Sequence, residues 1–101
     1  MPLSITNNNG IYEVKGTLNS KTTAFFKKHF ESLLTISNYL TISLNKVKDV
    51  DKSSVREIGK LCKKALNENK IMYFIGEENK EVCKKFKSQN LGYLIRHDNL
   101  D

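Results

Sequence analysis

The chain has 101 residues, of which 39% are hydrophobic and 28% are charged, with a single proline. These values are ordinary for one folded domain with a modest core and exclude a disordered chain. No apolar run approaches the roughly 18 residues of a membrane span, and the N-terminus lacks the charged head and apolar middle of a signal peptide. We therefore predict one cytoplasmic domain over residues 1–101, with 96–101 as a frayed tail.

Five segments are predicted to be strands. The first two are joined by the Asn-rich turn 7–10, which suits a hairpin because Asn and Gly tolerate positive φ. Segment 16–20 is expected to break the second strand. The almost wholly apolar segment 71–75 is typical of a strand covered on both faces. The predicted strands lie near 3–6 and over 11–15, 39–44, 71–75 and 91–95.

Three segments have apolar residues at helical spacing. The first follows Asn19 or Ser20, either of which can cap it. The second is marked from Val55 onward, and the third spans about 79–88, with Asn90 ending it in the left-handed conformation. The residues expected to face the core are Phe26, Phe30, Leu33 and Leu34 in the first helix, Val55, Ile58, Cys62, Ala65 and Leu66 in the second, and Val82 and Phe86 in the third.

This order of elements predicts an α/β fold. Helices that alternate with strands imply right-handed crossovers and a largely parallel sheet. We expect a mostly parallel sheet of four to five strands, an antiparallel N-terminal edge hairpin and three helices. In such sheets the functional surface is usually where strands end and helices begin.

The sequence KDVDKSSVRE, residues 48–57, lies at one of these junctions. Ser54 and Glu57 fit a capping box, and Asp51 is favourable near the positive end of a helix dipole. Helix capping of this kind gives Ser53 no role. An exposed hydroxyl there can instead be modified, and a phosphate would add roughly −1.5 to −2 charge next to free backbone amides.

No catalytic or metal-binding constellation competes with this junction. The five glycines are isolated, which excludes a glycine-rich phosphate loop. His29 and His97 lie far from the cysteines, and Asp49 with Asp51 makes only a weak acid–base pair. We therefore predict no enzyme, no metal and no cofactor, and we expect the two cysteines to be buried free thiols.

The net charge of +6 leaves two interpretations open. Fifteen of the seventeen basic residues are lysine, and no block of like charge reaches five. Aromatic residues are not interleaved with arginines as in a single-strand binder. We interpret the lysines mainly as solvated helix faces, with nucleic-acid binding as the less favoured alternative.

Several segments in order resemble the STAS family, the sulfate-transporter and anti-sigma-factor-antagonist domain. GTLN at 16–19 is similar to the end of its first conserved strand, with Asn19 in place of aspartate. LNKVKDVD at 44–51 resembles the strand and loop that follow, and DKSS at 51–54 stands where the family has aspartate–serine–serine–glycine. The segments 81–86 and 91–94 look like its closing helix and strand.

This resemblance implies a function for the junction. In the family, the second serine of the turn, here Ser53, is phosphorylated by a serine kinase that doubles as an anti-sigma factor. The unphosphorylated form binds that ATPase partner, and the phosphorylated form releases it. The resemblance implies a contact surface at the same turn, made of Asn19, Asp51, Lys52, Ser54, Val55, Arg56 and the nearby Gly59.

A second hypothesis keeps the fold but not the switch. In it, the domain is an accessory subunit that docks through the same turn on the ATPase of a lipid or anion transport system. Exposed lysines would suit a place near anionic lipid, although direct membrane contact is not expected.

Overall fold

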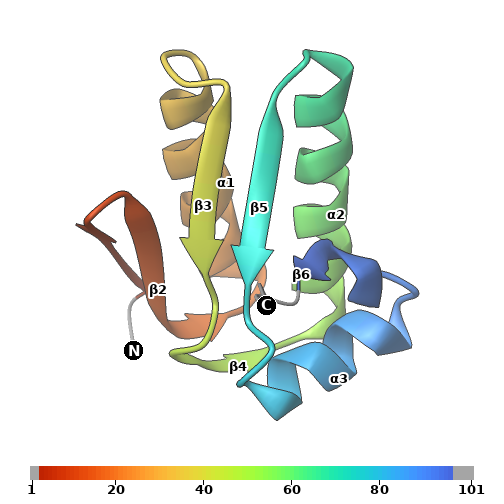
Figure 1. The fold of residues 1–101 in the computed structure, drawn as a ribbon. Coiled ribbons are helices and arrows are strands. Elements are labelled where there is room, and N and C mark those ends of the chain that lie inside the picture. The colour runs from red at the N-terminus through yellow and green to blue at the C-terminus, as the bar shows by residue number, and fades with distance from the viewer. Residues whose placement is uncertain (1–2, 97–101) are drawn as a thin grey trace, which may run out of the picture.

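The computed structural model describes residues 3–96, which form a six-stranded mixed sheet and three α-helices (Figure 1). A single turn of 3-10 helix, Gly92–Leu94, precedes the last strand. The strands are β1 (Ser4–Asn8), β2 (Ile11–Leu18), β3 (Tyr39–Ser43), β4 (Val47–Val50), β5 (Ile71–Ile75) and β6 (Ile95–Arg96), and the helices are α1 (Ser20–Leu34), α2 (Lys52–Asn67) and α3 (Lys80–Ser88).

The sheet has the order β1-β2-β3-β5-β6, and β4 pairs with β2 outside this path. Only β1 and β2 are antiparallel, so the predicted edge hairpin and largely parallel sheet are confirmed. The turn between them consists of Asn9 and Gly10, which have φ angles of 54° and 90°. Two successive residues at positive φ match the twist of the strands, which is why this turn closes the hairpin.

Strand β2 does not end where the sequence predicted. Its first half pairs with β3 and its second half with β4, and the register shifts between Gly16 and Thr17. Gly16 has a φ of 111°, which a residue with a Cβ rarely adopts. The glycine therefore redirects the strand instead of ending it. The expected break at 16–20 and the loop expected before Asp51 are both wrong, because Val47–Val50 forms strand β4.

The hydrophobic core lies between the helices and one face of the sheet. Figure 1 shows α1 behind β3, α2 beside β5, and α3 at the lower end beside β4. The predicted inward faces are largely confirmed, and Leu33 is half-buried. The predicted core residues that are buried are Phe26, Phe30, Leu34, Val55, Ile58, Cys62, Ala65, Val82 and Phe86.

Several detailed expectations are wrong for identifiable reasons. Strand β5 is covered on one face only, so Met72 and Phe74 are buried whereas Ile71 is 44% exposed. Leu66 is 62% exposed, because Leu61 takes the inward position on α2 instead. Most of the strand expected over 91–95 is 3-10 helix, after Asn90 ends the preceding helix with the expected positive φ of 60°.

The expected tail falls partly within the fold. Arg96 belongs to β6 and pairs with Ile75, so the chain is ordered one residue further than predicted. The rest of the expected tail lies outside the described residues. Within residues 3–96, no helix combines the length and apolar character that crossing a membrane requires.

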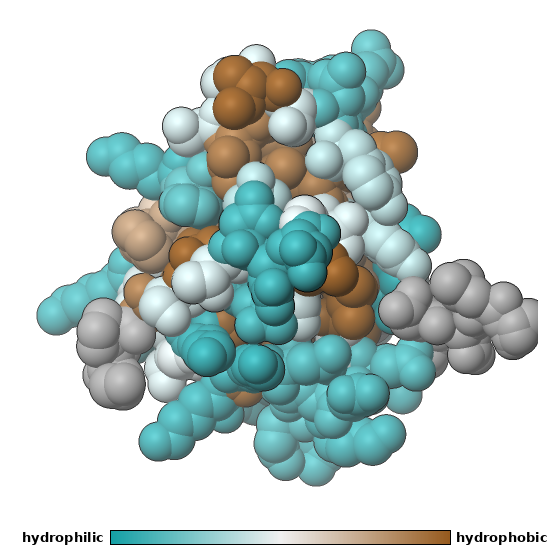
Figure 2. Space-filling view, turned by 60° about the vertical axis from the view of Figure 1, so that its left-hand side comes forward, coloured by the Kyte–Doolittle hydropathy of each residue, from teal (hydrophilic) through white to brown (hydrophobic). Residues whose placement is uncertain are grey.

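The two ends of the molecule differ in polarity. In the view of Figure 2 apolar residues gather at the upper end, and hydrophilic residues cover most of the lower end. Helices α1 and α2 begin at the lower end, as Figure 1 shows. Ile36, the most exposed large apolar side chain within residues 3–96 at 80%, follows α1 at the opposite end. The junction around Ser53 therefore lies at the hydrophilic end.

Candidate phosphorylation site and partner-binding surface

The pairing of β2 with β4 places the starts of two helices side by side. Leu18 and Val50 are register partners at the ends of these parallel strands. The backbone N–H of Asp51 donates to the Leu18 carbonyl at 3.1 Å. The next residue after each strand caps a helix, Asn19 for α1 and Asp51 for α2. Sequence segments more than 30 residues apart thus form one surface.

Helix α1 begins with the cap that the sequence suggested. The Asn19 side chain accepts hydrogen bonds from the backbone N–H groups of Lys21 and Thr22 at 3.0 and 3.1 Å. The Thr22 hydroxyl reciprocates as the acceptor for the Asn19 backbone N–H at 2.9 Å. This capping box fixes Asn19 beside the start of α2, half-buried at the rim of the surface.

Helix α2 is capped by Asp51, not by Ser54. Oδ1 of Asp51 accepts from the backbone N–H of Ser54 at 2.8 Å and from the Ser53 hydroxyl at 3.0 Å. The predicted capping box of Ser54 with Glu57 is therefore wrong. The Glu57 carboxylate instead accepts from Lys27 at 3.1 Å and Lys60 at 3.4 Å. Ser54 is displaced from the cap position because the helix starts three residues earlier, with Asp51 as its cap.

Ser54 connects the two helices inside the protein. Its hydroxyl oxygen accepts a hydrogen bond from the Thr23 hydroxyl of α1 at 2.7 Å, and both residues are buried. Val55 is also completely buried, in the core. Ser54 and Val55 were both expected to contact a partner. Because both are buried, they stabilise the junction from inside the domain and present no surface to a partner.

Ser53 is exposed, as an accessible phosphoacceptor must be. It lines a hollow of about 320 Å³ between the first turns of α1 and α2, together with Ser20, Ala24, Lys27 and Glu57. Lys27 lies on this side of Ser53, paired with Glu57 at 3.1 Å, and it is not among the predicted site residues. Only the packing of α1 against α2 brings it there, so no local sequence signal could have identified it.

The two basic residues of the expected contact surface, Lys52 and Arg56, differ in their contacts. Arg56 donates to the Gln89 side chain at 2.9 Å and so reaches toward the end of α3. Lys52 is exposed at the first position of α2. Lys85, which the prediction overlooked, donates to the Val50 carbonyl at 3.1 Å and lies 3.8 Å from Asp49. It thereby joins α3 to the end of β4, just before the turn.

The Asp51 carboxyl has a perturbed pKa. Partial burial raises this pKa, but hydrogen bonds from Ser54 and Ser53 and the positive charge of Lys85 outweigh burial and lower it below its ordinary value. Because the folded pKa is the lower one, the ionised cap stabilises the fold fully above about pH 4. That stabilisation is lost as the pH falls through the folded pKa.

We expect the Asp51→Asn variant to reveal this pH dependence. Asparagine can still cap the helix but does not titrate. The difference in unfolding free energy between wild type and variant should therefore shrink as the pH falls from 6 to 2. Urea unfolding at several pH values measures it. A difference that stays constant over this range would contradict a lowered Asp51 pKa.

The two cysteines of the described residues show no sign of reactivity or metal binding. Cys62 and Cys83 are free thiols, the first buried and the second half-buried. Desolvation raises the pKa of Cys62 to about 12, which keeps it protonated. Within residues 3–96 no three His, Cys, Asp or Glu side chains gather as metal ligands would.

These observations define an α/β domain in which two capped helices begin beside the carboxyl ends of neighbouring parallel strands. The family model of the STAS domain matches residues 1–95, and the chain therefore belongs to the STAS domain family.

Among solved structures, the anti-sigma factor antagonist SpoIIAA in its unphosphorylated form is similar. The match covers 96% of this chain and 88% of that one, with a TM-score of 0.73 and 10% sequence identity. At this identity the likeness establishes the α/β fold alone. A search of curated proteins gave no match.

Proposed function

We propose that this domain is a regulatory binding protein whose association with a protein partner is switched by phosphorylation of Ser53. The partner is a serine kinase of the anti-sigma-factor type, an ATPase that binds the unphosphorylated domain. The domain itself performs no catalysis. The proposed contact surface consists of Asn19, Asp51, Lys52, Ser53 and Arg56, with Ser54 and Val55 supporting it from inside.

The observation that carries this proposal is the position of the Ser53 hydroxyl. It is exposed at the second position of α2, while the neighbouring Ser54 hydroxyl is buried. A kinase active site must enclose the acceptor hydroxyl, so only the first of these two serines can react in the folded domain. This supports Ser53 as the switch, at the position that the family resemblance implies.

The local chemistry also tolerates a phosphate at this place. The first turn of a helix offers unsatisfied N–H groups and the positive end of the dipole. Lys27 lines the same hollow as Ser53 and is paired there with Glu57, whereas the nearby Asp51 carboxylate opposes a second negative charge. The fold is therefore expected to retain its stability, while an added charge of roughly −1.5 to −2 changes the surface that a partner reads.

Phosphate transfer tests the proposal directly. The tagged protein is used to recover the ATPase that copurifies from its own cells, and the purified pair is incubated with ATP. We expect intact-mass measurement to show one phosphate, which peptide mapping places on Ser53. The Ser53→Ala variant should remain unlabelled.

Ser54→Ala is the matched control, because it removes the adjacent hydroxyl but leaves the exposed one. It should be labelled as fully as wild type once circular dichroism shows that it is folded. Labelling of Ser53→Ala to the wild-type extent would refute the assignment. Recovery of a transport ATPase that binds without transferring phosphate would favour the accessory-subunit hypothesis instead.

A negative charge at position 53 should also change the affinity for the partner, which gives a second test of the proposal. Like charges placed at an interface cost several kcal/mol. We therefore expect Ser53→Asp to weaken binding to the same ATPase by at least about tenfold, which corresponds to about 1.4 kcal/mol. Isothermal titration calorimetry measures this, and Ser53→Asn is the uncharged control. An aspartate variant that binds as well as the asparagine variant would exclude a charge-operated switch.

A further inference from the structure

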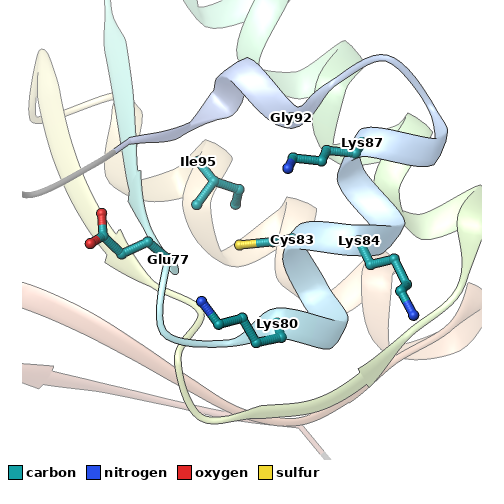
Figure 3. A pocket seen from close by; sticks show the side chains of 7 residues that line it. All are labelled: Glu77, Lys80, Cys83, Lys84, Lys87, Gly92 and Ile95. Carbon is teal, nitrogen blue, oxygen red and sulfur yellow. The ribbon is translucent and has the colours of Figure 1, made fainter.

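A second candidate site lies away from Ser53, on the other side of α3. It is a hollow of about 340 Å³ between α3, the loop that follows β5, and the segment that leads into β6 (Figure 3). Glu77 follows the carboxyl end of β5, and Ile95 begins its neighbour β6. In α/β proteins, ligands bind in crevices outside the carboxyl ends of parallel strands. The hollow therefore occupies a favourable place in the fold.

The side chains around this hollow combine positive charge with an apolar floor. Figure 3 shows Lys80 and Lys87 extending toward the same space from two ends of α3. The Cys83 thiol and the Ile95 side chain lie between them. The Glu77 carboxylate points away from that space in the same view. Two ammonium groups thus lie beside a floor of sulfur and carbon, and Glu77 and Lys84 also line the hollow.

The positions of these groups are fixed by their neighbours. The Cys83 thiol donates to the Gly76 carbonyl at 3.3 Å, which holds the sulfur at the floor. A Cβ on Gly92 would come within 2.8 Å of Cγ of Lys87, so only glycine lets the chain pass this closely over the lysine stem. The backbone at Gly92 therefore packs closely against the Lys87 side chain and limits its movement. Lys80 and Lys87 are exposed, and neither belongs to any of the ion pairs formed by Lys27, Lys46, Lys60, Lys64 and Lys85 within residues 3–96.

We propose that this hollow binds a small phosphate monoester that carries an apolar or aromatic group. Two ammonium groups that converge on one space match the double negative charge of a phosphate monoester above its second pKa of about 6. The volume suits a compact molecule at the lower end of the range for ligand pockets. The apolar group would contact Ile95 and Cys83. This site is independent of the proposed switch at Ser53.

Titration with phenyl phosphate at pH 7.5 tests the proposal, followed by ¹H–¹⁵N correlation spectra of the full chain. We expect saturable shifts centred on the amides of Cys83, Gly92 and Ile95. Inorganic phosphate should bind at least about fivefold more weakly, because it lacks the apolar group, and phenol should not bind measurably. Both lysines should contribute, so Lys80→Gln and Lys87→Gln should each weaken phenyl phosphate binding about fivefold, or about 1 kcal/mol.

Lys28→Gln is the matched control. It removes the same charge from an exposed lysine of α1 that does not line the hollow. The affinity of this variant for phenyl phosphate should stay within about twofold of the wild-type affinity. An equal loss for Lys28→Gln would show nonspecific attraction and refute the site. Shifts that spread over all lysine-bearing surfaces without saturating would do the same. Equal affinities for phenyl phosphate and inorganic phosphate would refute the apolar part of the ligand. None of these outcomes depends on Ser53.

Discussion

Phe30→Ala is expected to lower the free energy of unfolding by about 3–5 kcal/mol. Phe30 of α1 is completely buried at the centre of an aromatic cluster. Its ring makes edge-to-face contacts with Phe26 and Tyr12, at centroid distances of 4.7 and 5.8 Å. Alanine would remove the ring and leave a cavity beneath the sheet, which the surrounding helices cannot fill completely. Urea unfolding monitored by circular dichroism measures the loss.

Phe25→Ala is the control on the same helix. The Phe25 side chain is 49% exposed, and its ring lies 6.0 Å from that of His29, the one aromatic partner it has within residues 3–96. Its truncation should cost less than about 1 kcal/mol, because little apolar area leaves the core. Comparable losses for the two variants would mean that α1 does not pack against the sheet in the orientation described.

Asn79→Ala is expected to cost about 2–4 kcal/mol, the second large effect. The Asn79 side-chain oxygen accepts from the backbone N–H of Val82 at 3.2 Å and so caps α3. Its amide group donates to the carbonyls of Leu44, Asn45 and Val47, at 3.0, 3.3 and 2.8 Å. Loss of a cap costs about 1 kcal/mol, and carbonyls that lose a donor cost about 1–3 kcal/mol more. The Leu44 carbonyl keeps another donor, the Val47 backbone N–H at 3.1 Å.

Two further variants separate these contributions. Asn19→Ala removes a helix cap that has no such bridge, and it should cost only about 1 kcal/mol. Asn79→Asp keeps an acceptor for the α3 backbone but directs a carboxylate at three carbonyl oxygens, so it should destabilise at least as much as Asn79→Ala. If Asn79→Ala cost no more than Asn19→Ala, Asn79 would be merely a cap. Thermal and urea unfolding of the three variants make the comparison.

The sequence was sufficient for the α/β architecture because its apolar periodicity is strong. The inward faces of α1 and α3 follow from spacing alone, as does the hairpin from its Asn-Gly turn. Strand β4 was missed because four residues with only Val47 and Val50 buried give no periodic signal. The one-sided covering of β5 was missed because an apolar run does not reveal that the helices pack on one face.

At the candidate site, the sequence located the turn but not its internal arrangement. Asp and Ser are about equally good caps, so the choice between Asp51 and Ser54 depends on burial, which only the packing against Thr23 decides. Lys27 and Lys85 reach the turn from other elements. Such neighbours follow from how strands and helices pack in three dimensions, and no local pattern encodes them.

The hydrogen bond between Thr23 and Ser54 restricts how a modification of Ser53 could affect a partner. A glycine at position 54 would remove the acceptor of the Thr23 hydroxyl. In this protein the Ser54 side chain instead connects the start of α2 to α1 through a buried hydrogen bond. A phosphate on Ser53 would then alter the electric field around a rigid shape instead of reshaping the backbone. An effect that acts through the electric field alone is screened by dissolved salt, over roughly 8 Å at physiological ionic strength. The effect of the phosphate on partner binding should therefore become smaller as the salt concentration rises.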